Sequence, residues 1–383
     1  MGEAMKKRYK TKILGVIVAI VLTLSTLAAT ASAASKIETF EHKINIPTNK
    51  VWTIRLNKSL NSSIINSLGN YITVTSPRDG VIDVGLSYNE GTKAITITPP
   101  EGGYRTSSTY TIIVKEEIYD SLGTKINAPT VMEFSTVNSN NFNPSSIGEV
   151  SYYNLNYSLD TFANNQVNNR PVVVRYYGYN GSASKNDILQ YTNPSVFQND
   201  SFGIYQFLNL NYMEGITTDN LNNMLSGKGI LSGMGQAFQD ACRASNVSQP
   251  YAVSHALLET GDGASTLAKG VEYNGKIVYN FFGIGAIDSD PINKGAEMAY
   301  KQGWFSPEEA IKGGVKWIGD GYINSSYNQN TIYKMRWNGN SSGVPVHQYA
   351  TDVAWAYKQV KNTMNMLNKF PNAKLRFDIP VYK

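Results

Sequence analysis

Hydrophobic and polar positions alternate in short runs through the first third of the chain. Five runs alternate with period two or are rich in β-branched residues, and turns of Gly, Pro and Asn separate them: residues 51–57, 71–77, 94–100, 109–118 and 131–137. Period-two alternation is typical of a strand that buries one face. The pattern predicts a small antiparallel β-sandwich over residues 36–137.

The hydrophobic spacing changes after an Asn/Ser-rich break with a proline, which we interpret as a linker over residues 138–147. Beyond it, apolar residues recur three and four positions apart and predict helices within residues 224–245, 250–259, 306–323 and 352–370. Long loops rich in Tyr, Asn and Gly connect these segments. Residues 148–383 are therefore expected to form a second, mainly helical domain.

The first residues form neither domain. Basic residues at positions 6–12 precede an apolar run at 13–29, and Ala31 and Ala33 supply a small-x-small site. This order is typical of a signal peptide at residues 1–33, cleaved after Ala33. A retained membrane anchor is the alternative, because the run is almost long enough to span a bilayer.

Removal of the signal changes the charge of the chain. The formal charge of +5 becomes about +1, because the leader holds five of the 34 Lys and Arg and one of the 29 Asp and Glu. A nucleic-acid partner has no electrostatic support at that charge. Cys242 is the only cysteine and lies at helical spacing from Phe238, so we expect a small core residue and a fold without an internal disulfide.

Several functional motifs are missing. The sequence has no G-x-x-x-x-G-K-[ST], no H-E-x-x-H and no G-x-S-x-G. Its three histidines, His42, His255 and His347, are scattered, and His42 is expected at the surface. We therefore expect neither a metal site nor an organic cofactor.

Residues 248–263, SQPYAVSHALLETGDG, predict one helix with an unusual end. Ser248 is placed to cap it, Pro250 suits its first turn, and glycines end it. On a helical wheel only His255 and Glu259, one turn apart, form a polar edge; Leu258 helps to cover an apolar flank.

Glu259 occupies the last turn of this helix beside apolar neighbours. The negative end of the helix dipole and desolvation both raise the pKa of a carboxyl group, as a general acid requires near neutral pH. A solvated glutamate at a helix end, with His255 as its local partner, is the alternative. Local composition alone favours that alternative.

Five blocks in order carry a resemblance to a known family: residues 254–271, 279–291, 310–323, 333–338 and 347–356. They resemble the bacterial endo-β-N-acetylglucosaminidases of glycoside hydrolase family 73, and residues 205–216 and 225–238 resemble the amino-terminal part of longer autolysin members. The resemblance implies a lysozyme-like, mainly helical fold that cuts peptidoglycan between N-acetylglucosamine and N-acetylmuramic acid. It also implies that Glu259 is the catalytic general acid.

The expected fold class is multidomain. An N-terminal all-β sandwich, which resembles bacterial Ig-like modules, precedes a mainly α lysozyme-like (α+β) catalytic domain. A spacer without binding function is an equal interpretation of the sandwich.

A second catalytic group is harder to assign. Glycosidases usually use two carboxyl groups, and the candidates are Glu272 in a hairpin, Asp288, Asp290 and Asp352. Family members often carry an acidic residue near the position of Glu272. Tyr349 matches a family tyrosine that lines the catalytic centre, and the substrate acetamide is an alternative nucleophile.

Substrate-binding residues are expected among groups that stack on sugars or contact them. The candidates are His255, Tyr279, Phe282, Tyr333 and Trp337. Each aromatic residue has a core interpretation as well. Lys334 and Arg336 stand near these rings, where they could meet carboxylates; a solvated edge is the simpler account.

The sequence thus predicts a secreted, wall-associated peptidoglycan hydrolase without cofactor. Its expected partner is the glycan strand, with no nucleic acid, no membrane after signal removal, and a monomeric state. A muramidase or lytic transglycosylase on the same fold and a non-catalytic wall-binding protein are the alternatives.

Overall fold

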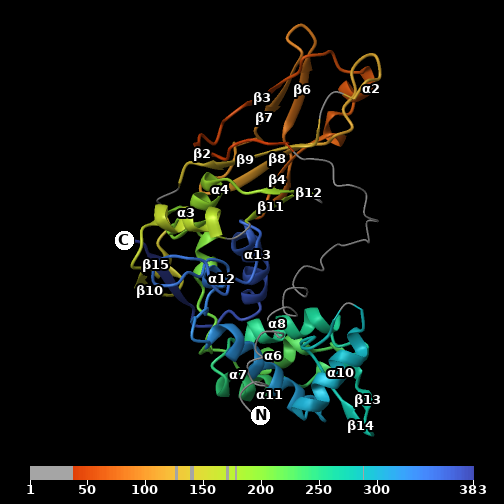
Figure 1. Ribbon diagram of the computed structural model, residues 1–383, viewed down its shortest axis with the longest axis vertical. Coiled ribbons are helices and arrows are strands. Elements are labelled where there is room, and N and C mark those ends of the chain that lie inside the picture. The colour runs from red at the N-terminus through yellow and green to blue at the C-terminus, as the bar shows by residue number, and fades with distance from the viewer. Residues whose placement is uncertain (1–37, 126–127, 139–141, 170–171, 177–178, 288) are drawn as a thin grey trace. The chain divides into compact units, whose positions relative to one another are not determined.

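The computed structural model describes residues 38–125, 128–138, 142–169, 172–176, 179–287 and 289–383 (Figure 1). The predicted signal peptide and Asp288 lie outside these residues. In the part of the chain that is described, no helix has the length and apolarity to cross a membrane. The chain forms two compact units. The helical unit consists of Leu208–Met335 and Asn362–Arg376. The second unit consists of the described residues up to Phe207, together with Arg336–Lys361 and Phe377–Lys383.

The N-terminal sandwich of the second unit has two sheets. The larger has the order β1-β9-β8-β4-β5, with β2 also on β9, and the smaller has the order β3-β7-β6. The strands are β1 (Glu38–Thr39), β2 (Lys43–Ile46), β3 (Trp52–Arg55), β4 (Ile72–Ser76), β5 (Gly80–Ile82), β6 (Gly85–Asn89), β7 (Ala94–Thr98), β8 (Thr109–Val114) and β9 (Thr130–Thr136). All five predicted strands are confirmed, as β3, β4, β7, β8 and β9.

One feature of the sandwich differs from the expected antiparallel arrangement. β1 and β2 both run parallel to β9. These two short strands carry no clear alternation, so their pairing depends on where the chain enters the sheet and not on a local pattern. Inward-facing Val74, Ile97 and Phe134 are fully buried and belong to one core cluster that joins both sheets.

Further elements of this unit lie outside the sandwich. They are β10 (Glu149–Asn154), α3 (Leu159–Asn169), β11 (Val173–Tyr176), β12 (Tyr179–Ser182), α4 (Lys185–Thr192), α5 (Pro194–Phe197), η4 (Gly203–Phe207) and the strand β15 (Arg376–Val381), which pairs with β10. The expected linker, residues 138–147, falls inside the unit, and its residues 139–141 are outside the described part. The domain boundary there stays a prediction.

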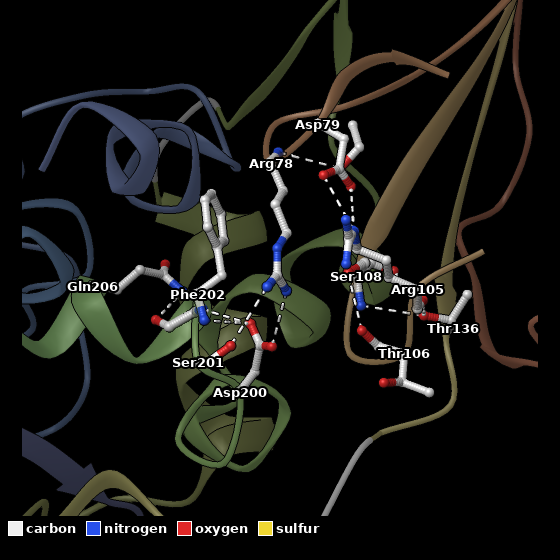
Figure 2. Close-up of polar contacts among 12 residues, drawn as sticks. Arg78, Asp79, Arg105, Thr106, Ser108, Thr136, Asp200, Ser201, Phe202 and Gln206 are labelled. Atoms are coloured by element: carbon white, nitrogen blue, oxygen red, sulfur yellow. Dashed lines mark hydrogen bonds and ion pairs between the residues drawn. The ribbon is translucent and has the colours of Figure 1, made fainter. Parts of the chain in front are cut away.

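Arg78 joins the sandwich to the segment before η4 (Figure 2). Its guanidinium lies 3.3 Å from Asp200 Oδ1 and 5.3 Å from the centre of the Phe202 ring. The Asp200 carboxylate also accepts hydrogen bonds from the backbone N–H groups of Phe202 and Gly203. A partly buried, hydrogen-bonded ion pair of this kind holds two segments in register.

The helical unit contains α6 (Thr218–Leu225), η5 (Gly229–Leu231), α7 (Gly235–Ala244), α8 (Gln249–Thr260), α9 (Thr266–Lys269), β13 (Val271–Tyr273), β14 (Lys276–Val278), α10 (Pro291–Gln302), α11 (Pro307–Ile318), the π-helical turn η6 (Gly319–Ile323) and α12 (Ile332–Arg336), which ends one residue beyond the unit. α13 (Trp355–Leu367) contributes its last residues. Figure 1 shows α6, α7, α8, α10 and α11 as one cluster with the β13–β14 hairpin at its edge.

The helices predicted at 250–259, 306–323 and 352–370 are confirmed as α8, α11 with η6, and α13. Residues 224–245 are not one helix, because Gly227, Gly229 and Gly233 adopt positive φ and interrupt the segment before α7. α7 packs against α6, α8 and α11. Phe238 and Cys242 are fully buried in it, and burial raises the pKa of the Cys242 thiol, so this cysteine is a core residue as expected.

Candidate active site

Two interactions fix the N-terminus of α8. The sequence predicts the first, a capping serine, but not the second, a contact between Gln249 and the backbone of Met213. Ser248 Oγ accepts a hydrogen bond from the Tyr251 N–H, and Pro250 lies in the first turn. The buried Gln249 side chain pairs with the backbone of Met213: Nε2 donates to its carbonyl at 2.9 Å, and Oε1 accepts from its N–H at 3.0 Å. This pair anchors α8 to the segment that carries Met213.

The C-terminus of α8 is held by a close approach of two backbone turns. Gly261 is left-handed, and the Asp262 N–H donates to Leu257 O at 2.8 Å, which satisfies a terminal carbonyl. At Gly263, whose φ is +79°, a Cβ atom would lie 2.2 Å from Lys228 O. Only glycine fits there, so the end of α8 is pinned against the turn that precedes η5.

Glu259 lies in this last turn and is largely removed from water. Its side chain is 9% exposed, and its Oε1 is buried without a hydrogen-bond partner among the described residues. Burial raises the pKa of Glu259 from 4.5 to about 7. The solvated helix end that local composition favours is therefore not what the structure has.

His255 is the nearest ionisable neighbour of Glu259, with Nε2 3.7 Å from Oε1. Burial lowers the pKa of His255 to about 4, so its imidazole is neutral at physiological pH. Its ring packs edge-on against Tyr251 and Phe282 at 6.0 and 5.8 Å. A neutral neighbour supplies no positive charge to stabilise the ionised form of Glu259. The effect of desolvation, which raises the pKa of Glu259, is therefore not offset by His255.

Asn280, which was not among the residues predicted from the sequence, organises the turn that carries Phe282. It is 2% exposed. Its Nδ2 donates to the carbonyls of Ile284 and Gly295, and its Oδ1 accepts from the N–H groups of Phe282 and Ile284. The sequence offered one signal, a polar residue between the aromatic residues Tyr279 and Phe281. An amide buried between such neighbours needs hydrogen-bond partners, and the nearby backbone supplies them.

Three of the predicted sugar-contacting aromatics are core residues in the structure. Phe282, Tyr333 and Trp337 are 3%, 1% and 4% exposed, so their faces pack on protein and offer no surface to a glycan. The substrate-binding prediction for these three is corrected on that ground. Tyr279 is half-buried and lies against Gly270, where a Cβ would come within 2.9 Å of the ring. Leu258, expected to cover an apolar flank, is 49% exposed.

Glu272 is exposed on the β13–β14 hairpin, opposite Ile277. The hairpin that the sequence predicts is therefore present. Asp290 precedes α10 and accepts a hydrogen bond from Asn293 Nδ2 at 2.9 Å, which is a turn role.

Arg336 is fully buried and arranges the segment that carries Tyr349 and Asp352. Its guanidinium donates to Gln348 Oε1 at 3.0 Å, to Thr351 O at 3.2 Å and to Asp352 O at 2.7 Å, and it stacks 3.7 Å from the Trp337 ring centre. The solvated edge expected for Arg336 is wrong, because a planar fork with three acceptors is what a buried arginine needs.

Lys334 is likewise buried, with Nζ 2.8 Å from Asn330 Oδ1. The solvated edge expected for it is wrong too, because its ammonium group is satisfied inside the protein.

Tyr349 and Asp352 belong to the second compact unit, whereas Glu259, His255 and Glu272 belong to the helical unit. Tyr349 is half-buried, with its ring 4.9 Å from that of Trp355. The Asp352 carboxylate accepts from the Ala354 N–H at 3.1 Å and from Lys358 Nζ at 2.7 Å. Both oxygens of Asp352 thus hold the start of α13.

His42, expected at the surface, is 3% exposed in the sandwich. It lies with Glu133 and Asp187 in the one group of possible metal ligands found among the described residues. This group belongs to the second unit.

Comparisons with known proteins relate both the sequence and the fold to glycan-cleaving proteins. A family model named Glucosaminidase, described as mannosyl-glycoprotein endo-beta-N-acetylglucosaminidase, matches residues 235–369. A beta-N-acetylglucosaminidase of Bacillus subtilis is 49% identical over 204 residues, which are 53% of this chain and 23% of that protein. A bifunctional autolysin of Staphylococcus aureus is 40% identical over 222 residues, 56% of this chain and 18% of that protein.

Two crystal structures match a larger share of their own length. S. aureus glucosaminidase B is 36% identical with a TM-score of 0.56, covering 62% of this chain and 94% of that one. A structure of the major bifunctional autolysin is 37% identical with a TM-score of 0.54, covering 62% and 99%. The chain thus spans less than a quarter of the curated relatives, at 23% and 18%, but nearly all of these two structures.

Proposed function

This chain belongs to the endo-β-N-acetylglucosaminidase family, and on that basis we propose that it hydrolyses peptidoglycan between N-acetylglucosamine and N-acetylmuramic acid. The observation that carries the proposal is Glu259, a carboxyl group with a buried, unpartnered oxygen and a pKa of about 7. A group with that pKa is protonated often enough at neutral pH to act as a general acid.

In the proposed reaction, Glu259 donates its proton to the glycosidic oxygen as the bond from that oxygen to the anomeric carbon of N-acetylglucosamine breaks. Water adds to that carbon and leaves a reducing N-acetylglucosamine end. Neutral His255 supports the acid because a protonated imidazole 3.7 Å away would lower the pKa of Glu259.

The partner of Glu259 is proposed among three groups. Glu272 is exposed on its hairpin and is available to assist a water molecule or the cationic transition state. Tyr349 is proposed to position that water or the substrate acetamido group. Asp352, whose carboxylate is engaged by Lys358 and by a backbone N–H, is assigned to holding the Tyr349 segment.

The remaining proposals concern the whole protein. We propose that residues 1–33 direct its export to the cell wall, that it acts there as a monomer without cofactor, and that residues 36–137 form an Ig-like module. Tyr279 is the aromatic residue proposed to contact the glycan, because it is half-buried whereas Phe282 and Tyr333 are buried.

The test uses purified cell walls and the Glu259→Gln variant, which keeps the size of the side chain. We expect release of soluble glycan to fall by at least about 10²-fold, the lower range for loss of a general acid, with an unchanged circular dichroism spectrum. Near-full activity in a folded variant would contradict the proposal.

Glu272→Gln, which changes a proposed partner of Glu259, is compared in the same assay. It should retain more activity than Glu259→Gln. Reduction of the digest and mass spectrometry identify the bond that is cut. Reduced N-acetylglucosamine is the expected end, whereas reduced N-acetylmuramic acid or an anhydro end would indicate a muramidase or lytic transglycosylase. No released fragment from the wild type would indicate a wall-binding protein.

A further inference from the structure

Three side chains that lie far apart in the sequence meet inside the second compact unit. His42 lies between β1 and β2, Glu133 in β9, and Asp187 in the first turn of α4. They are 3%, 4% and 8% exposed. Nothing in the proposed glycan chemistry uses them, and buried ionisable groups need a compensating partner.

One atom of each side chain points to a common position. His42 Nδ1 lies 3.2 Å from Glu133 Oε2 and 3.5 Å from Asp187 Oδ1, and the three atoms are all within 4.8 Å of one another. His42 Nδ1 and Glu133 Oε2 are buried and have no hydrogen-bond partner among the described residues. An imidazole nitrogen and two carboxylate oxygens converge there, and either a proton on Nδ1 or a metal ion between the three atoms compensates them.

The other polar atom of each side chain is already held by the protein. His42 Nε2 is 2.9 Å from Ser135 Oγ. Glu133 Oε1 accepts from the Tyr191 hydroxyl at 3.1 Å, and Asp187 Oδ2 accepts from Ser184 N and Oγ at 2.6 and 2.7 Å in the capping box of α4. Outer contacts of this kind orient the ligands of a metal ion.

Two of the three separations among the converging atoms, those from His42 Nδ1, agree with a tetrahedral ion. Zinc binds nitrogen and carboxylate oxygen at about 2.0–2.2 Å, and tetrahedral angles then separate neighbouring ligand atoms by about 3.3–3.5 Å. The separations from Nδ1 are 3.2 and 3.5 Å, and the two carboxylate oxygens lie within 4.8 Å of each other. The Asp187 side chain retains 12% exposure, through which a water molecule can reach a fourth position.

We propose that His42, Glu133 and Asp187 bind a divalent first-row transition metal, with zinc as the best fit. A nitrogen ligand and so few oxygens disfavour calcium and magnesium, which require six or more oxygen ligands or an octahedral hydrated shell. His42 and Glu133 belong to the sandwich, and Asp187 belongs to α4. An ion bound by all three therefore links the β1–β2 loop and β9 to the N-terminus of α4.

A proton is the competing cation. Burial alone lowers the pKa of His42, but the interactions with Asp187 and Glu133 outweigh it and raise the pKa to about 9. Tyr191, the other titratable group in contact, has its pKa raised well above the ordinary value by burial and by Glu133, so it stays neutral. Metal binding at Nδ1 releases this proton, so the two cations compete for one position.

The experiment measures zinc uptake by the untagged full chain after treatment with a chelator. Titration calorimetry at pH 7.5 should show one zinc ion per chain, bound more than about 100-fold more weakly by Asp187→Asn and by Glu133→Gln. Glu41→Gln, which removes the exposed carboxylate beside His42, and His347→Gln are the matched controls and should bind as the wild type does. No uptake by the wild type, or equal uptake by all variants, would overturn the proposal.

A second measurement on the wild type keeps the proposal testable if the ligand variants do not fold. Zinc-edge X-ray absorption of the loaded protein should show one imidazole and otherwise oxygen ligands. Two or more imidazoles would assign the ion to other histidines and overturn the site. The melting temperature of the zinc-loaded protein should also rise with zinc concentration, because the ion binds the folded chain alone.

Discussion

Replacing Glu259 by glutamine should stabilise the protein while it removes activity, and the size of the effect follows from burial. The carboxyl group is 9% exposed, and among the described residues its ion-pair neighbour is His255, which is neutral. Raising the pKa of Glu259 from 4.5 to about 7 corresponds to about 3 kcal/mol of free energy. That free energy is a cost of keeping a buried acid, and glutamine does not incur it.

The sign depends on pH in a defined way. Below pH 4.5 the carboxyl is protonated in both folded and unfolded chains, so the substitution should change stability little. Between pH 4.5 and about 7 the folded chain holds the proton that the unfolded chain has released, and native stability falls as pH rises. Above pH 7 the folded chain carries the buried anion, and the full difference of about 3 kcal/mol should favour Glu259→Gln.

Differential scanning calorimetry of both proteins at pH 4 and pH 8 measures this difference. At pH 8 the transition of the helical unit should shift upward by roughly 5–10 °C in Glu259→Gln, and at pH 4 by less than about 2 °C. Glu272→Gln removes an exposed carboxyl and should change stability by less than about 0.5 kcal/mol at both values. The reasoning would be refuted by an equal shift at both pH values, or by destabilisation at pH 8.

Three further outcomes are expected. Wall lysis by the wild type should decline as pH rises through about 7, because Glu259 loses its proton there; a rate that stays constant to pH 9 would oppose the assignment. Gly314→Ala should lower unfolding free energy by about 1–3 kcal/mol in urea titrations, since its Cβ would lie 2.0 Å from the Phe282 ring, whereas Gly321→Ala, with open space around it, should not. Arg336→Lys keeps the charge but not the planar fork, and should cost about 2–4 kcal/mol by the same measurement.

The sequence by itself determined the elements whose signals are local. Ser248, Pro250 and Gly261 mark the ends of α8 in any context, because capping and left-handed termini depend on residues within a few positions. Strands β3, β4, β7, β8 and β9 follow from period-two alternation for the same reason. The ordered motif blocks identified the family and singled out Glu259, although the local pattern around it favoured a solvated helix end.

Only the tertiary structure decided how each side chain is surrounded. The motif predicted that Phe282 and Trp337 contact sugar with exposed rings. In the structure both rings are buried. Arg336 acquires its three acceptors from residues 348–352.

The cluster of His42, Glu133 and Asp187 is the clearest case, because no spacing in the chain predicts that a loop, a strand and a helix end will meet. Burial and the pKa values that follow from it are sums over many distant groups. The sequence specifies which ionisable groups the protein has, and the fold determines how far each group is removed from water.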